Sequence, residues 1–100
     1  MYQFNIEFEY DADKSEANRL KHGVSLEEAK LLWIGSGAEL PSGYPSEVRW
    51  LRVGTIADKI FTCIFTYREK KVRLISLRRS REDEVNYYYR EMSKNEKEKT

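Results

Sequence analysis

Three strand-like segments lie close together in the second half of the chain, and this spacing constrains the fold more than any other feature. They cover roughly residues 47–56, 59–67 and 71–78, and each is rich in β-branched and aromatic residues. The connections Ala57-Asp58 and 68–70 have the length of β-hairpin turns, which join antiparallel strands. The sequence therefore predicts an antiparallel meander. Its central strand is 59–67, which is apolar or small on both faces.

The N-terminal part predicts one more strand and two short helices. Residues 2–10 alternate apolar and polar side chains with period two, which is typical of a strand with one buried face. A helix should begin at an N-cap on Asp13 and end at Gly23, which can adopt the left-handed conformation. A capping box, S-L-E-E from Ser25, then predicts a second helix that reaches Trp33.

The remaining segments complete the predicted topology. Residues 35–46 contain three glycines and two prolines, which predicts a long loop. Ser80 and Asp83 are expected to cap a last helix. With 100 residues the chain has room for one core, so we expect a single domain at 1–92 and a charged tail at 93–100. The order β-α-α-β-β-β-α predicts an α+β fold with a four-stranded, mainly antiparallel sheet and helices packed on it.

Composition limits the class of protein. The chain is 40% hydrophobic and 35% charged, as expected of a soluble globular domain. Its apolar runs are far shorter than the ~20 residues that cross a bilayer, and the N-terminus lacks the continuous apolar stretch of a signal peptide. We therefore expect a cytoplasmic protein without membrane contact. The lone Cys63 excludes an internal disulfide and a cysteine metal cluster, and its apolar neighbours predict a buried thiol; no metal or cofactor is expected.

The charge of the chain is unevenly distributed. Residues 66–81 hold seven basic residues and one acidic residue, a net charge of +6, whereas the whole chain carries +1. A basic segment of this kind indicates a polyanionic ligand. A solvated strand end and turn would explain the charge equally well.

Several segments resemble the BrnT toxins of type II toxin-antitoxin systems. FEYDADKSEANRLKHGVSLEEA resembles the opening of that family, and SEVRWLRVG and VRLISLRRSREDEVNYYY resemble its second half. The matched positions are Asn18, Lys21, His22, Gly23, Glu47, Arg49, Arg73, Ile75, Ser76, Arg78, Arg79, Glu84 and Tyr88. The chain departs from the family at Tyr10, where Trp is common, and at Leu77, where Ala is usual.

The resemblance implies a RelE-like fold and a metal-independent endoribonuclease that arrests growth. It also implies neutralisation by a BrnA-like antitoxin with a ribbon-helix-helix module, and contact with operator DNA only through that antitoxin. Metal-free RNA cleavage needs a base for the 2′-hydroxyl and positive charge at the phosphate. The candidate catalytic residues are His22, Lys21, Glu47, Arg49, Arg73 and Arg79. The candidate RNA-binding residues are Arg68, Lys70, Lys71, Arg78, Arg81 and Tyr88.

Alternative interpretations of these residues remain open from the sequence. His22 is of the residue type suited to act as general base or acid at neutral pH, but the end of a helix also favours histidine through its dipole. In a regular strand Arg73 and Arg79 share a face and Arg78 points the other way; Arg78 or Arg79 can instead pair with an acidic residue at the start of the last helix, Glu82 or Glu84.

The role of the aromatic residues and of the whole chain is equally open. Tyr88 and its two tyrosine neighbours can stack on a base or pack on the sheet. A module that binds antitoxin or nucleic acid without chemistry, or a purely structural subunit, fits the same basic segment.

Overall fold

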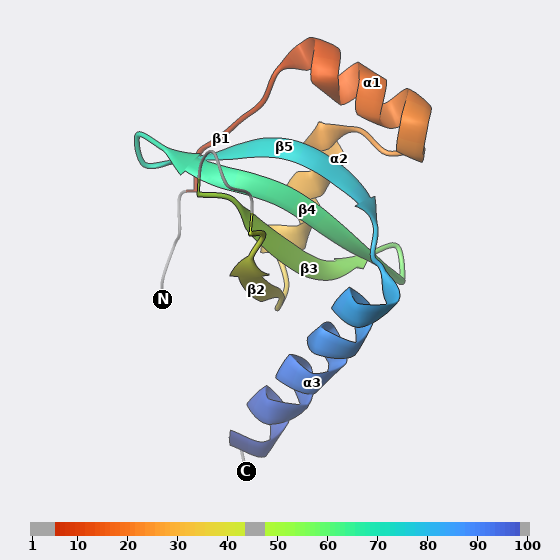
Figure 1. The fold of residues 1–100 in the computed structure, drawn as a ribbon, viewed down its shortest axis with the longest axis vertical. Helices are drawn as coiled ribbons and strands as arrows, with labels where there is room; N and C mark the ends of the chain where they lie inside the picture. Colours follow the sequence, from red (N-terminus) through yellow and green to blue (C-terminus); the bar gives the residue numbers. More distant parts are fainter. Residues whose placement is uncertain (1–5, 44–47, 99–100) are drawn as a thin grey trace.

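The computed structural model describes residues 6–43 and 48–98, the last four of these by their backbone only. A five-stranded sheet with the order β1-β5-β4-β3-β2 forms the centre of the molecule (Figure 1). The elements in chain order are β1 (Phe8–Glu9), α1 (Ala12–His22), α2 (Leu26–Ala29), the 3-10 helix η1 (Lys30–Trp33), β2 (Ala38–Pro41), β3 (Trp50–Ile56), β4 (Lys59–Arg68), β5 (Lys71–Arg79) and α3 (Glu82–Glu98).

The predicted α+β class and the antiparallel meander are confirmed, with β4 between β3 and β5. Both hairpins have two-residue turns, and all four turn residues have positive φ: 51° at Ala57, 66° at Asp58, 51° at Glu69 and 71° at Lys70. Two consecutive residues with positive φ match the right-handed twist of the flanking strands. The second connection is one residue shorter than predicted, because Arg68 is the last residue of β4.

The prediction of four strands was wrong, because the sheet has five, and the first strand differs in extent from the prediction. β2 lies within the segment predicted as a loop and pairs antiparallel with β3. It is a short edge strand, where Pro41 removes no hydrogen bond that the sheet needs. β1 is reduced to two residues and pairs in parallel with β5, Phe8 opposite Val72, so the sheet is mixed. Residues 1–5 of the predicted first strand lie outside the described residues.

Local signals predict the end of α1 and the start of α2 correctly, whereas the other helix limits differ from the prediction. Asp11, and not Asp13, is the N-cap of α1: its carboxylate accepts hydrogen bonds from the amides of Asp13 (2.9 Å) and Lys14 (3.0 Å). Gly23 ends α1 with φ 80°, as predicted, and the capping box at Ser25 is present. The second helix is α-helical only over α2 and then tightens into η1. α3 continues well past the predicted end of the last helix.

One face of the sheet carries the hydrophobic core. Leu26, Ala29 and Leu32 of α2 and η1 pack on Phe61, Cys63, Phe65, Val72, Leu74 and Leu77 of β4 and β5. We call this side the helical face, and Figure 1 shows α2 crossing behind the sheet there. Cys63 is fully buried, as predicted, and burial raises the pKa of its thiol, so the sulfur stays protonated.

α3 covers part of the opposite face. It lies against β2 and β3, and the Tyr87 hydroxyl donates a hydrogen bond to the Glu39 carbonyl (3.1 Å). Val53 and Ala38, which pair across β3 and β2, are 0% and 4% exposed. The helix therefore closes one end of this face and leaves the remainder of it accessible.

Asn18 fixes α1 beside β5. Its side-chain amide donates to the carbonyls of Val24 and Leu77 (both 2.8 Å), and its oxygen accepts the Leu77 amide (3.1 Å). The side chain thus pairs with Leu77 as a neighbouring strand would. Because Asn18 is 8% exposed, these bonds are protected from water, and they hold the end of α1 near the end of β5.

Candidate nucleic-acid interface

A β-bulge in β5 decides which arginines share a face. Ile64 of β4 lies opposite Ser76, whereas the next residue, Phe65, lies opposite Leu74. Ile75 is therefore an extra residue on β5. An extra residue reverses the alternation of side chains, so two residues an even number of positions apart lie on opposite faces when the extra residue is between them.

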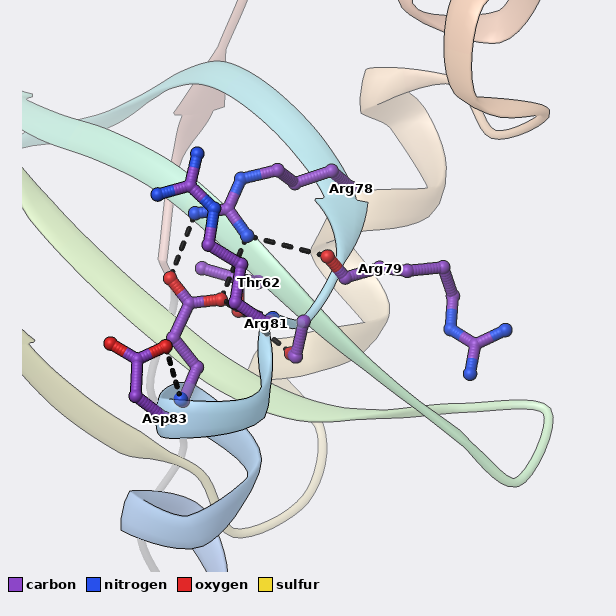
Figure 2. A network of polar contacts seen from close by, with 7 residues as sticks. Thr62, Arg78, Arg79, Arg81 and Asp83 are labelled. Carbon is purple, nitrogen blue, oxygen red and sulfur yellow. Dashed lines mark hydrogen bonds and ion pairs between the residues drawn. The ribbon is translucent and has the colours of Figure 1, made fainter.

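Arg73 and Arg78 consequently lie on the same face, and Arg79 lies on the other. Arg73 is opposite Thr66 and Arg78 is opposite Thr62, two positions four residues apart on β4. Arg79 is opposite Phe61, whose ring it covers at 5.6 Å. Figure 2 shows Arg78 and Arg79 leaving β5 in opposite directions. The prediction that Arg73 and Arg79 share a face was therefore wrong, since it assumed a regular strand.

We define the basic face as the side of the sheet that carries Arg49, Arg73 and Arg78. The Arg49 carbonyl accepts a hydrogen bond from the Ser42 amide (2.9 Å), so the pairing of β2 with β3 extends to Arg49. Arg49 lies two residues before Leu51, which is opposite Ile64, so its side chain lies on the same face as these two residues. The residues between these arginines, Leu51, Ile64, Thr66 and Ser76, are only partly buried. The basic face thus combines cationic groups with an accessible, partly apolar floor.

Arg73 is paired with a carboxylate from β1. Its Nη1 donates to Glu9 Oε2 at 3.0 Å, and both side chains are 28% exposed. Lys71 lies 3.8 Å from Glu7 of the same segment. The N-terminal acidic residues therefore balance the charge along the first half of β5.

Arg78 belongs to a buried polar network that joins β4, β5 and α3 (Figure 2). Its guanidinium donates to both oxygens of Glu84, at 2.7 and 2.8 Å. Glu84 also accepts the Thr62 hydroxyl (2.9 Å) and the Arg81 amide (2.8 Å), and it is 5% exposed. The alternative in which Arg78 pairs with an acidic residue of the last helix is confirmed.

The network changes the acidity of Glu84. Burial by itself raises the pKa of this carboxyl, but the hydrogen bonds from Arg78, Arg81 and Thr62, together with the charge of Arg78, outweigh it and lower the pKa to about 2. Glu84 is therefore a permanent anion at neutral pH, and its lone pairs are used by the fold. This excludes it as a proton acceptor in a reaction.

The other candidate RNA-binding residues lie at the two ends of β5. Arg68, Lys70 and Lys71 lie together at the β4-β5 hairpin. Arg81 is exposed beside the start of α3. Tyr88 lies on α3, partly buried, with its ring edge-on to that of Tyr89 at 5.6 Å. A ligand that extends along β5 would meet positive charge at both ends of the strand.

The candidate catalytic residues do not form one cluster. Arg49 and Arg73 belong to the basic face, whereas Lys21 and His22 lie in the last turn of α1, near the end of β5 that carries Arg79. In Figure 1 this end of α1 lies beyond the outer edge of β5. Glu47 lies outside the described residues. The fold therefore offers two separate groups of polar residues.

Arg52 is cationic but belongs to the core. It donates to the carbonyls of Leu32 (2.8 Å) and Gly35 (3.1 Å) and to Glu39 (2.7 Å), and it stacks on Trp33 at 5.2 Å. With its side chain 13% exposed, Arg52 closes the end of η1 on the helical face. It is unsuited to a large anionic ligand.

Two residues of this region escaped sequence reasoning. Neither Glu9 nor Thr62 is among the residues that the sequence predicts for the site. Their positions depend on the β1-β5 and β4-α3 contacts, which no local pattern encodes.

In the described part of the chain, no three His, Cys, Asp or Glu side chains gather into a group able to hold a metal ion. Over the same residues, no helix is long and apolar enough to cross a membrane.

The fold and the basic face define a small α+β protein with an arginine-bearing sheet surface suited to a polyanion. A family model described as the ribonuclease toxin BrnT of type II toxin-antitoxin systems matches residues 10–84. The chain therefore belongs to the BrnT family of ribonuclease toxins. A search of the curated proteins returned no match.

Proposed function

We propose that this protein is a metal-independent endoribonuclease that cleaves RNA in the cytoplasm and arrests growth. The observation that carries the proposal is the position of Arg49, Arg73 and Arg78 on one accessible face of the sheet. A guanidinium stays protonated and offers a planar pair of donors that matches phosphate oxygens. We also assign the fold to the RelE-like class on the strength of the family resemblance.

The mechanism follows from the charges of this face. When a ribose 2′-hydroxyl attacks the adjacent phosphorus, negative charge builds on the nonbridging oxygens. We assign the stabilisation of that charge to Arg73, which lies opposite Thr66 on β5, and to Arg49, which directly precedes β3 on the other side of β4. Lys70 and Lys71 would hold the RNA backbone at the hairpin end of β5. Arg78, fixed by Glu84, would hold it at the other end.

The test is RNA cleavage by purified protein in the presence of EDTA. We expect cleavage to persist and to leave 2′,3′-cyclic phosphate or 3′-phosphate ends, as attack by the 2′-hydroxyl requires. The Arg73→Ala variant should lose cleavage and the exposed Arg90→Ala variant should keep it, since Arg90 lies on α3 against Tyr87. Activity that disappears with chelator and returns with Mg²⁺ would contradict the metal-free mechanism.

A second candidate function is a binding module without chemistry. It is favoured by the ion pairs at Arg73 and Arg78, which leave both guanidinium groups partly neutralised. In that case the protein would bind single-stranded RNA or an antitoxin and release no cleavage product. The same incubation separates the two functions, because binding and product are measured on one sample.

Type II toxins act with an antitoxin, and we propose that the partner here is a BrnA-like ribbon-helix-helix protein that covers the basic face. Operator DNA would be contacted only through that partner. Anything that fills the face excludes RNA phosphates, so RNA and antitoxin should displace each other. RNA binding should also weaken with salt, because phosphate contacts release counterions. Simultaneous, independent binding of both would place neutralisation elsewhere on the protein.

A further inference from the structure

Glu9 brings a carboxylate to the basic face. Its neighbours along the chain, Phe8 and Tyr10, pack against the hydrophobic core, so the side chain between them points to the other side of the sheet. There Glu9 Oε2 accepts a hydrogen bond from Arg73 Nη1 at 3.0 Å. The pair places a proton acceptor directly beside a group able to bind phosphate.

The other carboxylates bonded to the basic residues of β5 are unsuited to accept a proton from a ligand. Glu84 is 5% exposed and its oxygens are occupied by Arg78, Thr62 and the Arg81 amide. Glu7 has a side chain that is 70% exposed, and it lies 3.8 Å from Lys71 near the hairpin. Glu9, at 28% exposure, is reachable by a ligand and held in place by one arginine.

We propose that Glu9 is the general base of the reaction, an assignment that rests on the proposed RNA cleavage. Its carboxylate takes the proton of the ribose 2′-hydroxyl while the 2′-oxygen forms a bond to phosphorus. The bond from phosphorus to the 5′-oxygen breaks, and that oxygen takes a proton from solvent. The products are a 2′,3′-cyclic phosphate and a 5′-hydroxyl, and Glu9 returns its proton to solvent.

Arg73 has two functions in this arrangement. It orients Glu9 through the 3.0 Å hydrogen bond, and we assign its remaining N–H groups to binding the phosphate that the same reaction charges. The parallel pairing of Glu9 with Arg73 therefore puts the proposed base and the proposed phosphate-binding group side by side. The family match begins at Tyr10, so the assignment rests on these contacts alone.

The test is the Glu9→Gln variant, which keeps the shape and removes the basic oxygen. We expect the cleavage rate to fall by about 10²–10⁴-fold, the contribution of a general base. RNA affinity should stay equal or increase, because Arg73 loses a competing anion. The acidic limb of the pH-rate profile should disappear. Glu7→Gln is the matched control, since it removes the same charge from an exposed position two residues away, and it should cleave as the parent does.

Each other outcome is decisive. If Glu9→Gln cleaves as fast as the parent or faster, Glu9 is only a counter-ion of Arg73 and the proposal is overturned. If it loses RNA binding or cooperative melting along with activity, Glu9 is structural; Glu9→Asp, which keeps a carboxylate, should then fail in the same way, whereas a base should retain intermediate activity. A parent protein that cuts no RNA would instead overturn the proposed function.

Discussion

Arg73 and Arg79 point to opposite faces of the same strand, although residues six positions apart share a face in a regular strand. The extra residue at Ile75 causes the reversal, because it shifts Arg73 opposite Thr66 while Arg79 stays opposite Phe61. The basic segment is thereby divided between two surfaces. Arg73 faces the proposed RNA site, and Arg79 stacks on the rim of the core near the end of α1.

This division makes the two arginines separable by mutation. Arg73→Ala should lower the cleavage rate by about 10²–10³-fold, the effect of removing one donor that stabilises transition-state charge, while the protein still melts cooperatively. Arg79→Ala should leave most of the activity in place. The measurement is the rate per folded molecule on a single-stranded RNA oligonucleotide. The reverse result would place the chemistry beside Lys21 and His22.

The buried Glu84 should make stability depend on pH in a defined direction. Its pKa is lowered from 4.5 to about 2, so the ionised form stabilises the fold above pH 4.5, and this contribution is lost as pH falls toward 2. Glu84→Gln should reduce the free energy of unfolding at pH 7 by about 1–3 kcal/mol, because Arg78 loses its charged partner, and should flatten the pH dependence. Urea unfolding from pH 7 to pH 2 measures both effects. Glu82→Gln, at an exposed position of the same helix, should change neither.

Much of the fold was predictable because its signals are local. The capping box at Ser25, the glycine that ends α1 and the two hairpins each depend on residues within a few positions of one another. The central position of β4 followed from its apolar residues on both faces. Asp11 replaced Asp13 as N-cap because either aspartate can cap a helix that starts nearby, and composition alone does not choose between them.

What the sequence left open depends on distant contacts. Nothing in Lys71–Arg79 marks Ile75 as an extra residue, since the bulge exists only relative to β4. β2 is specified by pairing with β3, and its glycine-rich and proline-containing surroundings resemble a loop. The pairing of Glu9 with Arg73 joins residues from opposite ends of the domain. The arginines of the candidate site could therefore be selected by residue type, whereas their division between two faces and the contribution of Glu9 could not be predicted.

The two hairpin turns offer a gain in stability. Ala57 and Asp58 have positive φ, which costs free energy in residues with a Cβ atom, whereas Asn-Gly adopts this conformation readily. Ala57→Asn with Asp58→Gly should raise the free energy of unfolding by about 0.5–1 kcal/mol without changing RNA affinity. Thermal melting and RNA titration measure the two quantities.

The same change in the second turn, Glu69→Asn with Lys70→Gly, separates stability from binding. It should stabilise the fold to a similar extent, since the backbone geometry is the same. It should also weaken RNA binding and reduce its salt dependence by roughly one counterion, because Lys70 is lost from the hairpin. Because the loss of Glu69 can offset the loss of Lys70 in the affinity, it is an unchanged salt dependence that would show that Lys70 does not contact RNA.

A charge introduced at Asn18 should lower the free energy of unfolding, as removal of the Glu84 charge does. The stability of the Asn18 variant should depend on pH in the opposite direction. Asn18→Asp keeps the shape but turns a carboxylate toward the carbonyls of Val24 and Leu77, which loses two hydrogen bonds and should cost about 2–4 kcal/mol at pH 7. Burial beside these carbonyls raises the pKa of the new carboxyl. The protonated form can donate to one carbonyl, so stability is present at low pH and is lost as pH rises through that pKa. The variant should therefore regain stability as pH falls from 7, measured by urea unfolding, whereas Asn86→Asp, at an exposed position of α3, should behave like the parent.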